Sequence, residues 1–197
     1  KQKISNKIYK KEDVGLPENS FVFCCFNQNY KITPNIFSIW MKLLKRIDNS
    51  VLWLLEENQT ASSNLKKEAE KKGIKSDRII FAKRMEQSEH FARHKLADIF
   101  VDTFPYNAHT TCSDALWSDL PVITLAGQSF ASRVGASILN AIDLKELITT
   151  TEEEYENLLF KLATNKEELE KIKNKLKKNK IKKPLFDTKL YTKNLET

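Results

Sequence analysis

The chain has 197 residues, of which 41% are hydrophobic, and it carries a net charge of +7. This length and composition suit one domain with a sizeable core. The start of the chain lacks a signal-peptide pattern, and no apolar run approaches the ~20 residues that cross a bilayer. The three cysteines, Cys24, Cys25 and Cys112, form no paired framework. We therefore expect a reduced, cytoplasmic protein without a membrane span.

The positive charge is concentrated in two segments. Residues 1–11 contain five lysines and residues 171–183 contain eight, and neither segment contains an acid. The rest of the chain holds 20 basic residues against 26 acidic ones, so its charge is about −6. A nucleic-acid-binding face on the core is therefore not expected. The second segment is interpreted as a solvated helix face, with contact to an acidic partner or a membrane surface as the alternative.

Strands and helices alternate in the predicted secondary structure. In chain order, apolar runs and helical periodicity predict strand 21–26, helix 34–47, strand 51–55, helix 63–72, strand 78–82, helix 88–96, strand 99–101, helix 110–118, strand 121–124 and helix 132–140. Thr33 and Pro34 supply an N-cap and a first-turn proline for the first helix. Gly73 is expected to end the second helix, and Ser132 to cap the last.

The arrangement of these elements predicts the fold class. Continuously apolar strands joined by helices are typical of a parallel sheet covered on both faces. We predict an α/β, doubly wound, Rossmann-like lobe over residues 20–148. Residues 1–19 are interpreted as a polar linker. Residues 149–197 are expected to form C-terminal helices, beginning at Thr151 and Asn165, and a tail that docks on the lobe.

The loops that follow the strands are the candidate ligand sites. Ligands in a doubly wound sheet bind beyond the carboxyl ends of the strands. These loops are residues 27–31, 82–87, 103–111 and 125–129. None carries the glycine fingerprint of dinucleotide binding or the phosphate loop of P-loop hydrolases. The chain also shows no Ser/His/Asp triad, carboxylate pair or zinc-ligand spacing, so no metal site is predicted.

The segment from Asp102 to Trp117 is the most informative. A strand ends at Asp102, and a short loop then delivers His109, Thr110 and Thr111 to the start of a helix. The N-terminus of a helix offers unpaired N–H groups and partial positive charge, which suit a pyrophosphate. On spacing alone, an ordinary cap by one of the threonines, with Asp114 closing a capping box, is the commoner explanation.

Three further side chains follow strands in the sequence. Lys31 lies in the loop after the first strand, where its ammonium can neutralise a phosphate, although a plain surface lysine fits the pattern as well. His90 opens the helix after the third strand and can stack on a base; a partly buried helix histidine is the alternative. Arg93 lies one turn further on the same side and can donate to a carbonyl or phosphate.

Several ordered segments together resemble the C-terminal catalytic half of the O-linked N-acetylglucosamine transferases and the related SPINDLY proteins. The resemblance covers the chain from about residue 15 to its end. It rests on residues 26–34, 50–55, 78–81, 89–90, 96–98, 102–103, 107–111, 114–117 and 131–134. The resemblance implies a glycosyltransferase of the GT-B type, with two Rossmann-like lobes and the donor between them. This chain would supply the C-terminal lobe, which holds the nucleotide in the family.

The resemblance also assigns roles to residues. Gln28 and Lys31 match positions that contact the donor diphosphate, and Lys31 would stabilise the leaving group. His109, Thr110 and Thr111 match the phosphate cradle at the helix start. The remaining matches are a ribose contact and two uracil-side contacts, at Asp114, His90 and Arg93. Gln87 lies near the ribose, at a position where animal members of the family carry a lysine.

The resemblance implies a specific sugar donor but does not identify the acceptor protein. The expected donor is UDP-GlcNAc; Gln87 and the loop 83–88 leave GDP-fucose, which some SPINDLY proteins use, as the alternative. No cofactor or metal is required. The family's N-terminal lobe and tetratricopeptide repeats are not recognisable here. We therefore expect the protein acceptor and the catalytic base to involve regions outside this chain, which alone would bind nucleotide weakly and not catalyse transfer.

Two other classes of function remain as alternatives. A non-catalytic binding or scaffold module would retain the fold without affinity for nucleotide. A nucleotide-dependent oxidoreductase is disfavoured because the glycine fingerprint is absent. The sequence does not predict the oligomeric state.

Overall fold

The computed structural model describes residues 2–196, and its centre is a six-stranded parallel sheet. The strands are β1 (Phe21–Cys25), β2 (Ser50–Leu55), β3 (Ile79–Ala82), β4 (Ile99–Val101), β5 (Val122–Leu125) and β6 (Ile148–Thr149). Their order is β3-β2-β1-β4-β5-β6, and every neighbouring pair is parallel. The order reverses between β1 and β4, which gives the switch point of a doubly wound sheet. The predicted fold class is confirmed.

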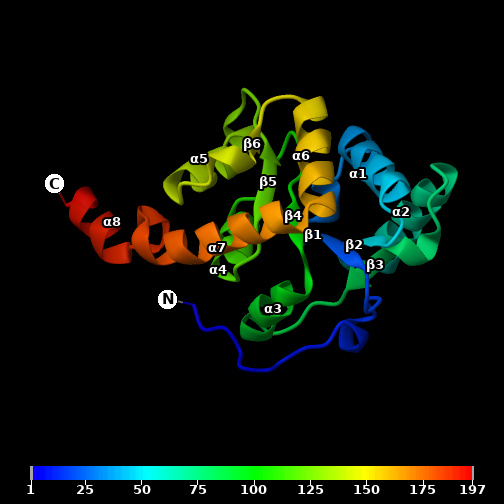
Figure 1. Ribbon diagram of the computed structural model, residues 1–197, viewed down its shortest axis with the longest axis horizontal. Coiled ribbons are helices and arrows are strands. Elements are labelled where there is room, and N and C mark those ends of the chain that lie inside the picture. The colour runs from blue at the N-terminus through cyan, green and yellow to red at the C-terminus, as the bar shows by residue number, and fades with distance from the viewer. Residues whose placement is uncertain (1, 197) are drawn as a thin grey trace.

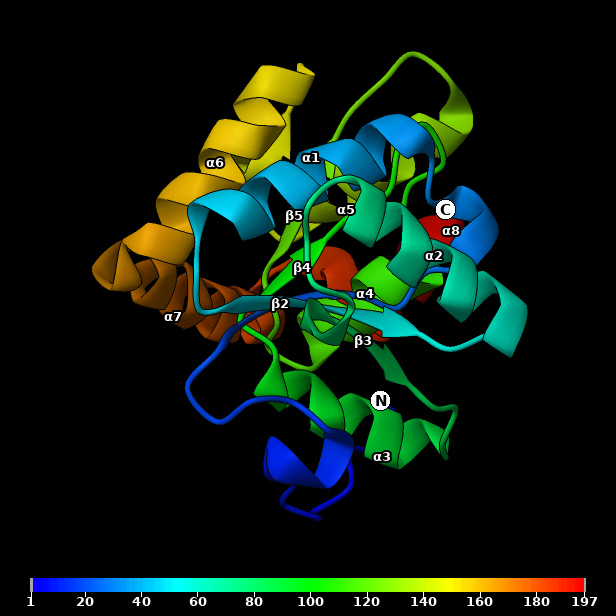
Figure 2. The ribbon, with the colours of Figure 1, turned by 90° about the vertical axis from the view of Figure 1, so that its right-hand side faces the viewer.

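Helices cover both faces of this sheet (Figures 1 and 2). They are α1 (Pro34–Arg46), α2 (Gln59–Lys71), α3 (Gln87–Arg93), α4 (Thr110–Trp117), α5 (Val134–Ala141), α6 (Glu152–Thr164), α7 (Lys166–Lys182) and α8 (Thr188–Leu195). Figure 2 shows α1, α2 and α6 on one side of the sheet and α3 on the other. Helix α4 contacts both α3 and α5. This layering buries the apolar strands on both faces.

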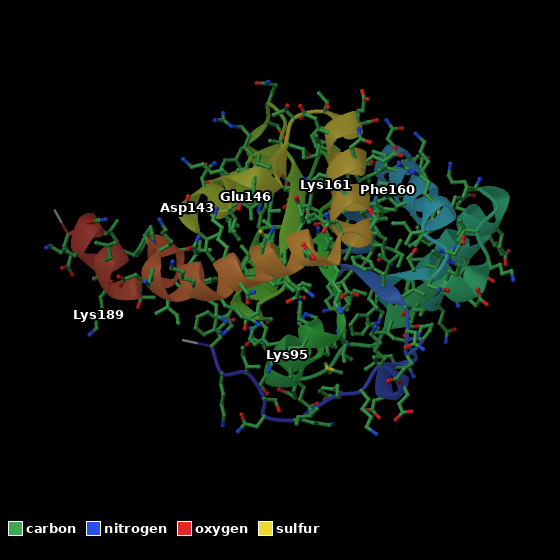
Figure 3. The ribbon with its side chains drawn as sticks, viewed as in Figure 1. Lys95, Asp143, Glu146, Phe160, Lys161 and Lys189 are labelled. Carbon is green, nitrogen blue, oxygen red and sulfur yellow. The ribbon has the colours of Figure 1, made fainter. Side chains whose placement is uncertain are left out.

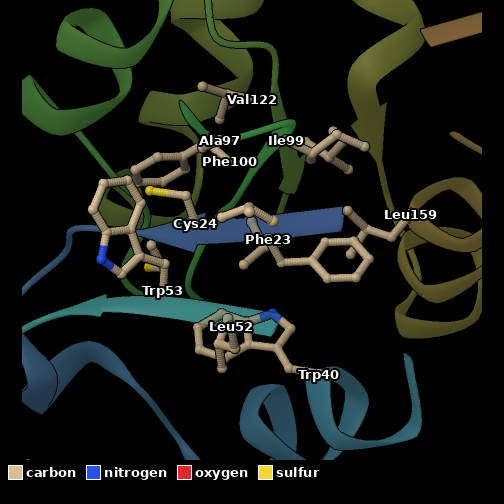
Figure 4. Close-up of a cluster of buried hydrophobic side chains, with 14 of the residues drawn as sticks. Phe23, Cys24, Trp40, Leu52, Trp53, Ala97, Ile99, Phe100, Val122 and Leu159 are labelled. Carbon is tan, nitrogen blue, oxygen red and sulfur yellow. The ribbon is translucent and has the colours of Figure 1, made fainter. Parts of the chain in front are cut away.

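The hydrophobic core lies between the sheet and these helices. Figure 4 shows Trp40 of α1 and Leu159 of α6 on either side of Phe23 in the central strand β1. All three side chains are at most 2% exposed. A buried polar chain ties the same helices to the sheet: Trp40 donates to the Tyr155 hydroxyl at 3.2 Å, which donates to the backbone oxygen of Asp102 at 2.8 Å. Packing and hydrogen bonding therefore fix the end of β4 from one side.

Several predicted helix boundaries are confirmed, and two are wrong. Thr33 caps α1 as expected, and the capping box at Thr151 is formed. Helix α2 begins at Gln59 rather than residue 63, because Asn58 accepts a hydrogen bond from Ala61 N and caps an earlier turn. Ser132 does not cap α5. It ends a short 3₁₀ turn that Ser129 caps, and α5 begins two residues later.

The basic segment 171–183 pairs with the body of the protein. Four of its lysines form ion pairs with acids of the lobe: Lys173–Asp98, Lys175–Glu146, Lys180–Asp119 and Lys183–Asp143. Figure 3 shows Asp143 and Glu146 beside α7. The negative body and the positive segment thus neutralise each other in part. Neither interpretation from the sequence, a solvated helix face or contact with an external partner, included these ion pairs within the chain.

The two ends of the chain also contact the lobe. Phe186, just beyond α7, packs against Trp117 of α4 with ring centroids 5.1 Å apart. At the other end, the backbone N–H of Ser5 donates to the Ser88 carbonyl at 2.9 Å, and Trp117 donates to the Gln2 carbonyl at 3.0 Å. Figure 1 shows this N-terminal segment running beside α3. No helix within residues 2–196 has the length and apolar character to span a membrane.

Candidate functional site

The candidate site is a cleft of about 630 Å³ at the carboxyl ends of β1, β3 and β4. All nine site residues expected from the sequence line it: Gln28, Lys31, Gln87, His90, Arg93, His109, Thr110, Thr111 and Asp114. They come from three segments that lie far apart in sequence: the turn after β1, helix α3 after β3, and the start of α4 after β4. In a parallel sheet the carboxyl ends of all strands lie at one edge. The segments that follow the strands therefore meet at that edge, near the switch point.

The start of α4 is open toward the cleft. His109 occupies the N-cap position, and no side chain caps the helix. Thr110 and Thr111 lie within the first turn, so the alternative of a threonine cap with a capping box is wrong. No residue of the described chain accepts a hydrogen bond from the backbone N–H groups of these two threonines. Such N–H groups, together with the helix dipole, form an anion-binding site.

The hydroxyl of Thr111 points into the protein rather than serving as a donor for a ligand. It donates to the side-chain oxygen of Asn27, the second residue after β1. Asn27 is buried, and its amide nitrogen donates to the Thr103 hydroxyl at 2.8 Å. This amide therefore joins the loop after β1, the loop after β4 and the first turn of α4. Asn27 is not among the site residues expected from the sequence, although it begins the candidate loop 27–31 that follows the first strand.

Lys31 reaches the same cleft from the 3₁₀ turn Asn29–Lys31. Its ammonium donates to the Asn107 carbonyl at 3.1 Å, and it lies 3.7 Å from the centroid of the Tyr106 ring. Partial burial lowers the pKa of Lys31, while the nearby carboxylate of Asp102 acts in the opposite direction. Lys31 and the start of α4 thus line the same cleft at the carboxyl edge of the sheet.

Asp102 organises the loop that carries this site. One carboxylate oxygen accepts the backbone N–H groups of Thr103 and Ala108, at 2.7 and 2.6 Å, and the other accepts the Thr124 hydroxyl at 2.6 Å. The side chain is fully buried, and burial raises its pKa to about 7 against the effect of these hydrogen bonds. The carboxylate folds the loop back on itself, which presents the Asn107 carbonyl to Lys31.

The opposite wall of the cleft carries His90 and Arg93. Arg93 is 1% exposed; its Nε donates to His90 Nδ1 at 3.0 Å and its Nη1 to the Lys83 carbonyl at 2.6 Å. Burial, with help from His94 and Arg93, lowers the pKa of His90 to about 3. His90 is therefore neutral, and because its Nδ1 accepts from Arg93, its proton resides on Nε2. Gln87 lies exposed at the first position of α3.

Asp114 completes the lining one turn into α4. Its side chain is half-buried, and burial raises its pKa to about 6. A carboxylate in this position can accept hydrogen bonds from a sugar diol at neutral pH. Cys112, on the same helix, is fully buried, and burial raises the pKa of its thiol well above the ordinary value. This cysteine is therefore part of the packing and not a reactive group.

Comparison with known proteins identifies relatives of the chain. Residues 2–195 match the model of glycosyl transferase family 41. The probable UDP-N-acetylglucosamine–peptide N-acetylglucosaminyltransferase SEC of Arabidopsis thaliana is 42% identical over 192 residues, which are 97% of this chain and 20% of that protein. A UDP-N-acetylglucosamine–peptide N-acetylglucosaminyltransferase of Caenorhabditis elegans is 36% identical, over 92% of this chain and 16% of that protein. The chain thus spans about a fifth of these relatives' length.

Solved structures agree with the sequence relatives. A mutant O-GlcNAc transferase of Thermobaculum terrenum superposes with a TM-score of 0.84 at 28% identity, over 93% of this chain and 36% of that one. A UDP-GlcNAc 2-epimerase of Neisseria meningitidis has a TM-score of 0.59 at 14% identity, over 83% and 41% of the two chains, which is a likeness of fold alone. From the family match and the sequence relatives we conclude that this chain belongs to glycosyl transferase family 41.

Proposed function

We propose that the cleft binds UDP-GlcNAc and that this chain is the nucleotide-sugar-binding lobe of a protein O-GlcNAc transferase. The observation that carries the proposal is that Lys31 and the open first turn of α4 line one cleft at the switch point of the sheet. The names of the relatives, which the chain matches over 92% and 97% of its own length, support the choice of donor.

The cleft suits glycosyl transfer because it concentrates positive potential where charge develops. When the bond between the sugar and the diphosphate breaks, negative charge accumulates on the departing UDP. The ammonium of Lys31, the free N–H groups of Thr110 and Thr111, and the dipole of α4 stabilise that charge without reorganisation. Gln28 and the imidazole of His109, which also line the cleft, add polar contacts to the phosphates.

The remaining residues recognise the nucleoside. The Nε2–H of His90 offers a hydrogen-bond donor or a flat ring to the uracil, and Arg93 fixes that tautomer. Asp114 accepts from the ribose hydroxyls, with Gln87 at the rim. We assign the acceptor polypeptide and the general base to regions of the protein beyond this chain. We further propose a cytoplasmic location, supported by the three buried cysteines, all unpaired.

Calorimetric titration of the chain with UDP, GDP, UDP-GlcNAc and GDP-fucose tests this proposal. We expect binding of the two uridine nucleotides in preference to the two guanosine nucleotides. Lys31→Ala is expected to weaken UDP binding at least about tenfold, because a charge-assisted contact of roughly 1.5–3 kcal/mol is lost. Lys166→Ala, an exposed lysine on α7 outside the cleft, serves as the control and should bind UDP like the parent chain.

The alternative outcomes distinguish the rival functions. Preference for GDP and GDP-fucose would replace the donor and leave the transferase assignment in place. A folded chain with affinity for none of the four compounds would instead support a scaffold module and overturn the proposal.

A further inference from the structure

The aromatic ring of Tyr106 lies directly against the ammonium of Lys31. The distance from Nζ to the ring centroid is 3.7 Å, well within the ~6 Å over which a cation is attracted to a ring face. The same Nζ donates to the backbone carbonyl of the next residue, Asn107, at 3.1 Å. Lys31 therefore has two fixed neighbours on a single loop.

Tyr106 is itself held by its surroundings. Its backbone carbonyl accepts a hydrogen bond from the Thr103 hydroxyl at 2.6 Å. Its ring contacts His109 and Tyr30, with centroids 5.2 and 6.2 Å away. Tyr106 is 39% exposed and lines the cleft. A side chain anchored on three sides but open to the cleft can fix a neighbour and still leave room for a ligand.

We propose that Tyr106 is a positioning residue that holds the Lys31 ammonium in place for the diphosphate of the nucleotide sugar. An ammonium carries three N–H donors. The Asn107 carbonyl takes one, and the ring face attracts the charge, so the amine is directed toward the open N-terminus of α4. A free lysine side chain costs up to about 2 kcal/mol of rotamer entropy to fix on binding, and the ring reduces that cost in advance.

The inference rests on the proposed function, because the diphosphate is the target of Lys31. It also predicts different effects on UDP binding and on uridine binding, whereas general damage to the fold would weaken both. Lys31 acts on the phosphates alone, so loss of the ring should weaken binding of UDP and leave binding of uridine, which has no phosphate, unchanged.

The test compares UDP and uridine affinities of the chain and its variants by calorimetry. Tyr106→Leu, which keeps bulk but lacks a ring, should weaken UDP binding by about 3- to 30-fold, the range of a cation–π contact. Its affinity for uridine should stay within about twofold. Tyr106→Phe keeps the ring face and should restore most of the UDP affinity. Circular dichroism checks that each variant folds.

A double-mutant cycle gives the second arm of the test. If Tyr106 acts through Lys31, then the Tyr106→Leu change should have no further effect on UDP binding in a Lys31→Ala background. An equal loss in both backgrounds would show that Tyr106 acts on the ligand directly and would overturn the inference, as would an equal loss of uridine affinity or failure of Tyr106→Phe. If the parent chain binds no UDP, the proposed function fails first; if it binds UDP and Tyr106→Leu binds it equally well, only this inference fails.

Discussion

Asp102 connects the stability of the fold to the geometry of the site. Its carboxylate accepts from Thr103, Ala108 and Thr124, and its burial raises its pKa from the ordinary 3.8 to about 7. The raised pKa means that the ionised form is costly where it lies, even with these donors. A residue that shapes the loop between β4 and α4 therefore reduces the stability of the folded protein at neutral pH.

This cost predicts a pH-dependent effect of Asp102→Asn. The amide oxygen can still accept from the backbone N–H groups of Thr103 and Ala108, while the amide nitrogen can donate to the Thr124 hydroxyl. The folded parent binds more protons at this group than the unfolded chain between pH values of about 4 and 7, so its stability falls with rising pH in that window. The free energy of unfolding of the variant, relative to the parent, should therefore rise across the window and level off above it.

Urea denaturation of both proteins at several pH values between 4 and 8.5 measures this difference. The comparison cancels the contributions of the other titrating groups, including His90 and His94, whose pKa values burial lowers. A difference that does not change with pH would contradict the assigned burial cost of Asp102.

At the scale of elements, the sequence predicts the positions of the candidate site residues better than the contacts that hold their side chains. Apolar runs locate the ends of the strands, and this predicts that Lys31 and His109 lie at the carboxyl edge of the sheet. Helix starts with a capping residue beside a clear apolar stripe, such as Thr33 and Thr151, were also predictable. The start of α2 was not, because its first turn, Gln59–Ser62, is mostly polar and shows no apolar period.

The contacts within the site could not be predicted for a different reason. The ring of Tyr106 meets Lys31, and the amide of Asn27 meets Thr111, across separations of 75 and 84 positions in sequence. Strand order and loop direction bring these pairs together, and single-sequence periodicity carries neither. Similarly, β6 has two residues, too few for an apolar pattern to stand out.

The approach of α5 to the sheet gives a prediction at this scale. Gly135 lies on α5, where a Cβ atom would be 2.6 Å from the Thr124 hydroxyl and 2.8 Å from the Asp102 carboxylate. The Thr124 hydroxyl and the Asp102 carboxylate are hydrogen-bonded to each other and buried, so they have little room to move. Gly135→Ala should therefore lower the free energy of unfolding by about 1–3 kcal/mol, as overpacking does. Ser137→Ala, at an exposed position on α5, should change it by less than about 0.5 kcal/mol.

Denaturant unfolding of the two variants measures both values. If the cleft binds UDP as proposed, the Gly135→Ala change should also weaken that binding, because it displaces the Asp102 carboxylate that folds the loop between β4 and α4. Equal stability of the two variants would show that α5 can move away from the sheet at little cost.

At the scale of the whole molecule, the distribution of charge explains how the C-terminal helices stay attached. The body of the chain is acidic and α7 is basic, and the ion pairs between them join distant parts of the sequence. Exposed pairs of this kind contribute little individually, at most about 1 kcal/mol. Burial and hydrogen-bond geometry together decide which of them matters. The side chains of Lys180 and Lys173 are only 16% and 20% exposed, compared with 39% for Lys175. Lys173 lies 3.6 Å from Asp98, too far for a good hydrogen bond, whereas Lys180 is hydrogen-bonded.

Lys180 should therefore dominate the attachment of α7. Its ammonium donates to Asp119 and to the Trp117 carbonyl, the latter at 2.9 Å, and lies 5.4 Å from the Trp117 ring. Asp119 has a positive φ of 65°, an uncommon conformation for a residue other than glycine, so this lysine also stabilises the turn that follows α4. Lys180→Ala should lower the free energy of unfolding by about 1.5–3 kcal/mol, the range for a charge-assisted hydrogen bond.

Lys175→Ala is the matched control, since it removes one lysine from the same helix and breaks a more exposed pair with Glu146. Its effect on the free energy of unfolding should stay below about 1 kcal/mol and shrink as salt screens the pair. The effect of Lys180→Ala should persist in larger part at high salt, because it includes a partly buried hydrogen bond to a backbone carbonyl, which carries no net charge for salt to screen. Urea denaturation of both variants at low and at 1 M salt separates the cases. Equal changes in the free energy of unfolding, with the same dependence on salt, would show that net charge holds α7 on the lobe. The contacts of Lys180 with Trp117 and Asp119 would then have no special role.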